Sequence, residues 1–535
     1  MYKTLAAVLV TFGALPAIAQ NADDLNRVID QGLNHSQVMQ TAEHLMDVIG
    51  PRMTNSPGMR QAEAWTQSQF KSWGLKNVHK EGFDFGRGWS VVSSSVRMTA
   101  PRPLQLTAIP VAWTPATNGT VTAQIVVAPL RRERDFEQWR GKLAGKIVLL
   151  SLPGDGSEPG EPPFQRLTAE AITKLDQYSQ PTDMARIERL LKRYSMVPKI
   201  DAFLKSEKAV AWARESYRDG KLLHGEGYAY RTGETPALPG IEIAAEDYRR
   251  LARLAKVGPA PTLEITSNVQ FDDRDPKAYN ILAEIPGSDA QAGYVMAGAH
   301  LDSWAAGDGA ADNGAGSVTV MEAARILAAL GVRPKRTIRF VLWAGEEQGL
   351  LGSRAYVEKY LATRPGPAAD EPTSSIVQYV RWRTRFPITP KPGYKDLVAY
   401  FNMDNGSGKI RGIHAEGNVA ATAMFQDWLQ PFASMGAGAV VASSTGSTDH
   451  EHMQQVGVPG YQFIQDPLDY ESRVHHSGID TFDHLKAEDL RQASVVLAGI
   501  LLEAATSAKT LPRMPLPTKP TAVNPFSYDD PADAD

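Results

Sequence analysis

Short apolar runs alternate with amphipathic segments through the second half of this chain. Residues 294–299 and 397–403 are apolar runs that predict buried strands, and 336–344 alternates between apolar and polar positions as a strand does. Between the first run and the alternating segment, apolar residues recur at helical spacing at Val320, Ala324 and Leu327. Strands that alternate with helices predict an α/β fold, in which a mixed β-sheet is flanked by helices.

The first half of the chain has a different pattern. Residues 21–85 have a helical pattern, whereas 88–271 contain short β-like runs separated by turns and by a charged helical stretch at 167–218. A final helix is expected at about 486–505. This change of pattern predicts a β-rich domain inserted into the α/β fold.

Acidic and histidine residues stand where the predicted strands end. His300 and Asp302 follow the first apolar run, Asp312 stands between a glycine-rich loop and a helix, and Asp404 follows the run 397–403. Two adjacent acids, Glu346 and Glu347, follow the alternating strand, and a later loop carries His475 and His476. Open α/β sheets bind their ligands at the carboxyl ends of the strands. We therefore expect these side chains to form a site there.

Imidazole and carboxylate ligands suit zinc, with manganese or cobalt as substitutes. The chain has no cysteine, which excludes a thiolate site, a thiol nucleophile and disulfides. Because adjacent residues at a turn project in different directions, one of Glu346 and Glu347 can bind a metal while the other remains free as a base. Taken singly, each acid is explained by a turn or by the first turn of a helix. Five such placements at strand ends together favour a metal site.

Five motifs occur in a fixed order: HLD, GAADNGAG, GEEQGLLGS, NMDNG and HHSGIDT. With these motifs the chain resembles the di-zinc aminopeptidases and carboxypeptidase Q-like enzymes, which form peptidase family twenty-eight of the metallopeptidases. The resemblance implies a zinc exopeptidase-like fold and two Zn²⁺ ions per chain. It implies that Asp312 bridges the two ions, that His300 and Asp404 complete one, and that Glu347 and His476 complete the other. Asp302 would then orient His300, and Glu346 would be the general base that deprotonates the attacking water.

Other polar residues keep more than one interpretation. His475 is the alternative to His476 as the ligand, and Asp480 is expected to turn its loop. Asp449, His450 and His452 of STDHEHM are read as structural or substrate-contacting. A proline- and arginine-rich insertion at 362–394 carries three arginines that bind a substrate carboxylate or form an exposed basic loop: Arg381, Arg383 and Arg385.

The expected domain limits follow from these patterns. Residues 1–19 resemble a secretory signal peptide, with Lys3, an apolar centre and an Ala-Ile-Ala end, and predict export to the periplasm or beyond. The catalytic domain is expected at 20–87 and 272–508, followed by a proline-rich and acidic tail at 509–535. The insertion at 88–271 resembles a protease-associated domain through GKIVLLSL and PGIEIAAEDYRRL. Its predicted role is a lid, and the alternative is a solvated addition.

Composition limits the partners. The 535 residues carry a net charge of −4 without a long basic block, which gives no reason to expect nucleic acid. No stretch is long and apolar enough to predict a membrane span. The partner expected from the resemblance is a peptide or dipeptide substrate.

The resulting hypothesis is a secreted zinc exopeptidase that hydrolyses terminal peptide bonds. An aminopeptidase is the first choice and a carboxypeptidase Q-like dipeptidase is the alternative. Two further classes share this kind of fold: glutaminyl cyclases, which use one zinc ion, and receptor-like proteins that have lost their metals. The complete ligand set and the presence of Glu346 favour hydrolysis over both.

Overall fold

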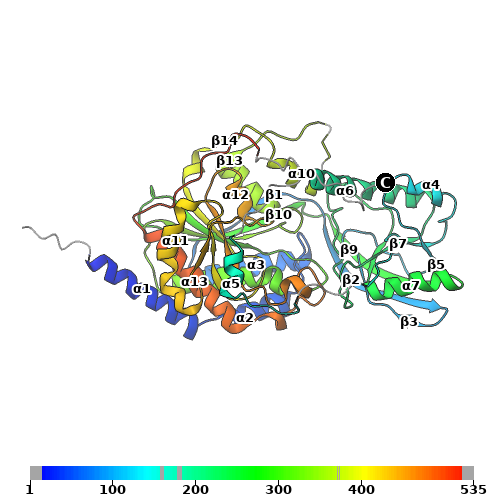
Figure 1. Cartoon of the computed structure of the whole chain (residues 1–535), viewed down its shortest axis with the longest axis horizontal. Helices are drawn as coiled ribbons and strands as arrows, with labels where there is room; N and C mark the ends of the chain where they lie inside the picture. The colour runs from blue at the N-terminus through cyan, green and yellow to red at the C-terminus, as the bar shows by residue number, and fades with distance from the viewer. Residues whose placement is uncertain (1–14, 157–161, 177–183, 370, 373, 521–535) are drawn as a thin grey trace, which may run out of the picture.

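The structure, a computed structural model, describes residues 15–156, 162–176, 184–369, 371–372 and 374–520. Two lobes lie side by side, each built on an eight-stranded sheet (Figure 1). Both sheets contain parallel and antiparallel pairs and are covered by helices, so the predicted α/β class is confirmed.

The larger lobe contains the sheet with the order β1-β10-β12-β11-β15-β18-β16-β17. Its four central strands, β12, β11, β15 and β18, are parallel, so their carboxyl ends lie at one edge. The strands span Lys76–Asp84 (β1), Lys277–Ile285 (β10), Thr337–Trp343 (β12), Tyr294–His300 (β11), Leu397–Asn402 (β15), Gly460–Gln465 (β18), Ile410–His414 (β16) and Ala439–Val441 (β17).

Helices cover both faces of this sheet. On one face, α8 (Ala315–Ala329) and α13 (Ala487–Thr506) pack against each other and against β11. Val295 and Ala297 of β11 join that core, whereas Met296 joins a second core on the opposite face, with Tyr356 of α9 (Leu351–Tyr356). Because both faces are covered, the central strands are buried along their length rather than at every second residue.

In the described part of the chain, three α-helices and a π-helix (His44–Ile49) precede the first strand; the α-helices are α1 (Leu15–Asn34), α2 (Val38–Glu43) and α3 (Pro57–Ser72). The first of them packs on α8 and α13. The third begins where Ser56 Oγ accepts a hydrogen bond from Met59 N at 3.2 Å, with proline at its first position. These helices complete the cover on one side of the larger lobe.

The chain leaves the first sheet after β1 and returns to it at β10. The two crossings lie together, since Phe85 N donates to Pro276 O at 2.9 Å and Arg87 pairs with Asp273 at 2.6 Å. All strands of the second sheet fall between them, in the order β3-β2-β9-β5-β6-β7-β8-β4. They span Leu104–Gln105 (β3), Gly88–Ala100 (β2), Thr262–Asp272 (β9), Val121–Val127 (β5), Ile147–Leu149 (β6), Ala211–Glu215 (β7), Gly240–Ile243 (β8) and Ala108–Pro110 (β4).

Two helices flank the second sheet. Tyr248 and Leu251 of α7 (Ala245–Val257) join one core of the smaller lobe, and Phe203 of α6 (Met184–Ser206) joins another. The remaining α-helices are α4 (Asp135–Trp139), α5 (Ala169–Lys174), α10 (Ser375–Trp382), α11 (Thr422–Leu429) and α12 (His450–Gln454). The exact domain limits and the protease-associated character of this lobe stay predictions.

Two segments that we expected to be helical are strands. Residues 76–84 form β1 at the sheet edge, and 211–215 form β7 inside the predicted helical stretch 167–218. The first is polar and shows little alternation, and the second, AWARE, is composed largely of good helix formers. In both, pairing with neighbouring strands overrides the local preference.

The structure describes only part of the two ends of the chain. Most of the predicted signal peptide, residues 1–14, and the end of the tail, 521–535, lie outside the described residues. Among the described residues, no helix is long and apolar enough to cross a membrane.

Candidate metal centre

Three neighbouring parallel strands place most of the predicted ligands at one edge of the first sheet. His300 is the last residue of β11, Asp404 follows β15, and Glu346 and Glu347 follow β12 after a turn at Gly345. Asp312 comes from the loop between β11 and α8. The side chains therefore meet because the strands that precede them run in the same direction.

The loop that carries Asp312 is held from several sides. The backbone N–H groups of Ala311 and Asp312 donate to the Asp480 carboxylate at 2.6 and 3.0 Å. The fully buried Arg52 donates to the carbonyls of Leu301 and Gly309 at 2.8 and 2.7 Å. Asp480 therefore has a structural role, but its carboxylate fixes the backbone of a candidate ligand on another loop instead of turning its own loop as we expected.

His300, Asp312 and Asp404 form the first candidate metal group, with ligand atoms within 4.8 Å of one another. His300 Nε2 lies 3.3 Å from Asp312 Oδ1 and 3.6 Å from Asp404 Oδ1. All three residues are buried.

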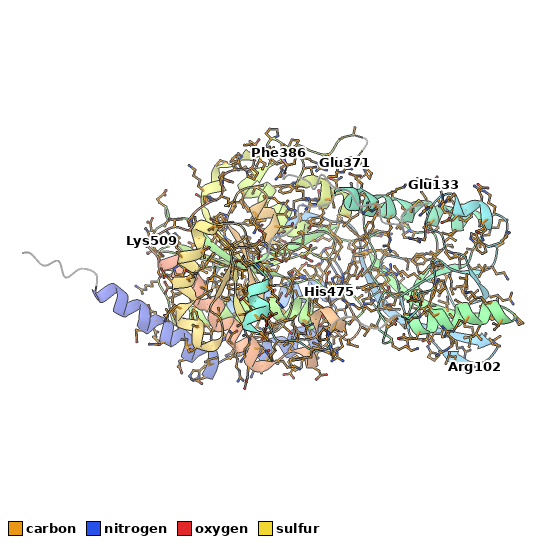
Figure 2. The ribbon with its side chains drawn as sticks, viewed as in Figure 1. Arg102, Glu133, Glu371, Phe386, His475 and Lys509 are labelled. Carbon is orange, nitrogen blue, oxygen red and sulfur yellow. The ribbon has the colours of Figure 1, made fainter. Side chains whose placement is uncertain are left out.

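His476, Asp312 and Glu347 form a second constellation. His476 Nε2 lies 3.2 Å from Asp312 Oδ2 and 3.0 Å from Glu347 Oε2. Asp312 therefore directs one carboxylate oxygen to each imidazole. His475 is also near, with Nε2 at 3.6 Å from Asp312 Oδ2, and its ring lies 3.8 Å from that of His476. Figure 2 places His475 between the two lobes.

The residues present fit a metal centre. Asp312 Oδ2 and Glu347 Oε1 are buried and accept no hydrogen bond from the described residues. An orphaned buried carboxylate oxygen is costly unless a cation compensates it. The donor set of imidazoles and carboxylates, without thiolates, is one that suits zinc.

The acids of the centre are buried and lie close to one another, and both conditions shift their pKa values. Burial raises the pKa of Glu347 to about 7, although His476 opposes the shift. Burial also raises the pKa of Glu346 well above its usual range, and the charges of Asp404 and Asp449 add to this effect. Burial opposes the ionisation of Asp312 as well, but the neighbouring imidazoles of His300 and His476 hold its pKa well below the usual value.

Asp302 does not contact His300 in the way that we expected. The ring Nδ1 of His300 lies 2.9 Å from the backbone carbonyl of Asp302, whereas the carboxylate is 3.8 Å away. That carboxylate instead accepts from the N–H groups of Glu346 and Glu347, both at 3.3 Å, and from Thr54 Oγ1 at 3.1 Å. Asp302 thus orients His300 through its backbone and the two glutamates through its side chain.

The STDHEHM segment lies beside the centre. His450 pairs with Glu416 at 3.2 Å, and His452 Nδ1 lies 3.3 Å from Ser353 Oγ. Burial and two arginines hold the pKa of His452 well below its usual value, so this ring is neutral. Asp449 is fully buried, which raises its pKa to about 7, and its charge acts on Glu346. Neither histidine belongs to the candidate metal groups found in the described residues.

Two arginines of the 362–394 insertion are already paired. Arg381 lies 2.8 Å from Glu188, and Arg385 hydrogen-bonds Glu371 and also Gln378, the latter at 2.8 Å. These contacts occupy part of each guanidinium, and the role in binding a substrate carboxylate stays a prediction.

Sequence reasoning missed one residue of the centre. Glu226, from the smaller lobe, places Oε1 at 2.8 Å from Nδ1 of His476. It lies 250 positions away in the chain, and only the folded arrangement of the lobes brings it near.

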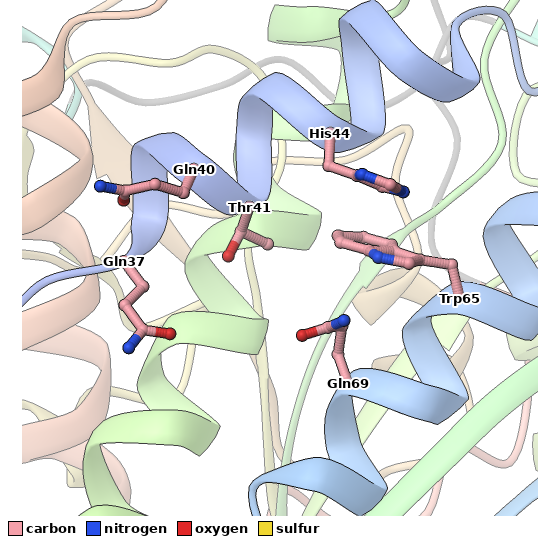
Figure 3. Close-up of a pocket in the computed structure, with 6 residues that line it drawn as sticks. All are labelled: Gln37, Gln40, Thr41, His44, Trp65 and Gln69. Atoms are coloured by element: carbon pink, nitrogen blue, oxygen red, sulfur yellow. The ribbon is translucent and has the colours of Figure 1, made fainter.

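A separate surface hollow of about 450 Å³ lies between α2 and α3 (Figure 3). It is lined by Gln37, Gln40, Thr41, His44, Trp65 and Gln69, with the His44 and Trp65 rings stacked at 4.6 Å. None of these residues is a candidate ligand, so this hollow is distinct from the metal centre.

An aspartate that lies between two imidazole–carboxylate groups, with Glu346 nearby, is an arrangement suited to a metal-dependent hydrolase. A family model agrees: residues 280–501 match Peptidase family M28. The part of the chain that carries the candidate ligands therefore matches the family that its motifs predicted, and the chain is a metallopeptidase.

Known proteins match much of the chain. Carboxypeptidase Q of Mus musculus is 26% identical over 473 residues, which cover 88% of this chain and 86% of that protein. The structure of a peptidase M28 precursor from Shewanella amazonensis matches with a TM-score of 0.66 at 23% identity, and covers 94% of this chain and 100% of that one. A zinc aminopeptidase from Bacillus subtilis matches with a TM-score of 0.55 at 18% identity, over 88% of this chain and 94% of that one. These two structures confirm the zinc exopeptidase-like fold.

Proposed function

We propose that this protein is a zinc-dependent exopeptidase that hydrolyses terminal peptide bonds, and that it acts as an aminopeptidase. The observation that carries the proposal is the position of Asp312. Its two carboxylate oxygens lie 3.3 and 3.2 Å from the imidazoles of His300 and His476. A carboxylate placed in this way is suited to hold two ions together.

His300 and Asp404 would hold one zinc ion, Glu347 and His476 the other, and Asp312 both. When bound, the ions supply Lewis-acid polarisation of the scissile carbonyl and a lowered pKa of water. His475 remains the alternative ligand, although His476 lies closer to Asp312.

Glu346 is the proposed general base. Its carboxylate lies beside the first ligand group, 3.9 Å from His300 Nε2, and its side chain is 10% exposed. Its raised pKa suits a group that takes a proton from the attacking water and returns it to the leaving amine. Such proton transfer typically contributes about 10²–10⁴-fold to the rate.

The substrate is proposed to be the end of a short peptide. The centre is rich in acids, which suits the positive α-ammonium group of a free N-terminus. The two insertions meet each other: Leu191 of α6 packs on Val377 and Val380 of α10, and Glu188 pairs with Arg381. We propose that the two insertions together cover the centre and limit the access of long peptide substrates.

A carboxypeptidase Q-like dipeptidase is the second candidate. It is favoured by the similarity to carboxypeptidase Q, which extends through both lobes over 88% of this chain. Glutaminyl cyclisation and metal-free partner binding rank lower, because two ligand groups and Glu346 are all present.

We also propose that the protein is exported. The proposal rests on the sequence of residues 1–19, with its early lysine, apolar centre and small-residue end.

The proposal can be tested with the purified mature protein and its Glu346→Gln variant. Zinc content is measured, and hydrolysis of amino-acid anilides, free dipeptides and N-acylated dipeptides is followed before and after chelation. We expect about two zinc ions per chain, cleavage of anilides and free dipeptides only, and loss of activity on chelation. Preference for free dipeptides over every anilide would favour the dipeptidase. Cleavage of N-acylated dipeptides would contradict an aminopeptidase, and an inert, metal-free protein would contradict the enzyme.

A further inference from the structure

The two histidines of the proposed centre are oriented by different parts of the molecule. His300 ends a central strand, and its Nδ1 faces the carbonyl of Asp302 two residues away. His476 lies on a loop and has a left-handed backbone (φ 58°). Its Nδ1 faces Glu226 of the smaller lobe at 2.8 Å.

The position of Glu226 is fixed by the second sheet. Its backbone carbonyl accepts from Arg214 Nη2 at 2.9 Å, and the same guanidinium binds Glu242 at 2.7 Å. Glu242 is 1% exposed and also accepts from His224 N at 2.7 Å. Ala112 N donates to Gly225 O at 2.8 Å. These hydrogen bonds therefore fix the backbone at Gly225 and at Glu226 itself.

The smaller lobe also forms hydrogen bonds with the backbone of the loop that carries His475 and His476. Arg218 Nη1 donates to His475 O at 2.7 Å, and Gly478 N donates to Leu223 O at 2.8 Å. With the Glu226 contact, three hydrogen bonds surround His476. They tie the part of the loop around His476 to the smaller lobe, whereas Asp480 of the same loop binds the backbone of Ala311 and Asp312 in the larger lobe.

We propose that Glu226 is a positioning residue for His476, and that the smaller lobe thereby completes the metal centre. As a carboxylate, Glu226 accepts a hydrogen bond, so Nδ1 carries the proton and the Nε2 lone pair faces Asp312 and Glu347. A carboxylate behind a ligating histidine fixes its tautomer and aim, and its loss typically costs about 10–100-fold in metal affinity. The inference rests on the proposed zinc centre.

The test compares Glu226→Ala, Glu226→Gln and a control, Glu264→Gln, in the full chain. Glu264 lies on the same lobe, where it pairs with Arg97 at 2.6 Å. Zinc stoichiometry and dissociation constants are measured by competition with a chromophoric chelator. We expect Glu226→Ala to bind one of the two ions about 10–100-fold more weakly. Glu226→Gln should fall between this and the wild type, because its amide oxygen still accepts from Nδ1, and Glu264→Gln should match the wild type.

A second measurement separates positioning from folding. With cobalt in place of zinc, the visible absorption of one ion should change in Glu226→Ala while that of the other is kept. If Glu226→Ala fails to fold, as judged by circular dichroism, Glu226→Gln decides. Wild-type affinity for both ions in the folded variants would overturn the inference, and so would equal weakening in Glu264→Gln. Since none of these measurements needs turnover, a protein that binds two zinc ions but cleaves nothing would contradict the proposed function alone.

Discussion

Both sheets contain adjacent parallel strands with acids near their ends, yet among the described residues the candidate metal groups lie at the first sheet alone. In the smaller lobe, Glu215 and Glu242 lie on β7 and β8, and each is paired: Arg249 lies 3.6 Å from Glu215 and Arg214 lies 2.7 Å from Glu242. In the larger lobe, the partners of Asp312, Glu347 and Asp404 among the described residues are imidazoles and a backbone N–H group. The carboxyl ends of parallel strands bring acidic side chains together. Where the buried acids outnumber the basic side chains, a bound cation is needed to compensate their charge.

The largest loss of metal binding and activity is expected at Asp312, where the excess of buried acid over basic side chains is concentrated. Asp312→Ala removes the one carboxylate that contacts both imidazoles, so both ions should be lost and hydrolysis should fall to the uncatalysed level. Metal analysis and anilide hydrolysis check this. The matched control is Asp219→Ala in the smaller lobe, whose partner is Arg249 and which should retain both ions. Retention of two ions by Asp312→Ala would mean that Asp312 is not the shared ligand.

The second-largest effect is expected on the rate of hydrolysis, without a loss of metal. Glu346→Gln should retain both ions and lower kcat by about 10²–10⁴-fold, since it removes only the proton acceptor. Steady-state kinetics together with metal content checks this. A loss below about tenfold would exclude Glu346 as the general base.

A smaller, selective effect is expected at the adjacent histidines. His476→Ala should lose one ion, because its Nε2 lies 3.0 Å from Glu347. His475→Ala should keep both, because its contact with Asp312 is longer, at 3.6 Å. Metal stoichiometry of the two variants decides between them, and the reverse result would make His475 the ligand.

The smallest effect is expected on the stability of the smaller lobe, where Glu215 and Glu242 are paired with arginines. Burial alone would raise the pKa of Glu242, but hydrogen bonds from His224 and the charge of Arg214 lower it from 4.5 to about 2. A lowered folded-state pKa adds stability above pH about 4.5, which is lost as the pH falls towards about 2. Glu242→Gln should therefore be less stable by about 3 kcal/mol at pH 7. Urea unfolding at several pH values should show this gap shrinking below about pH 4.5, and a gap that does not change with pH would contradict the assignment.

The comparison also explains what the sequence could predict. The strands β11 and β15 are recognisable because they are buried along almost their whole length and are largely apolar, and Asp302 and Asp404 each lie two residues after their ends. The partner of His476 was not recognisable, because Glu226 reaches it only through the packing of two lobes. The strands β1 and β7 were missed for the same reason, since pairing with distant segments decides their conformation.

Anomalous diffraction at the zinc edge, from crystals of the full chain grown with zinc, tests the central claim most directly. The account predicts two peaks on either side of Asp312, each about 2.0–2.2 Å from its ligand atoms. One peak should lie with His300 and Asp404, and the other with Glu347 and His476. A single peak, or peaks at His450 and Glu416 instead, would contradict a two-ion centre built on the ends of the parallel strands.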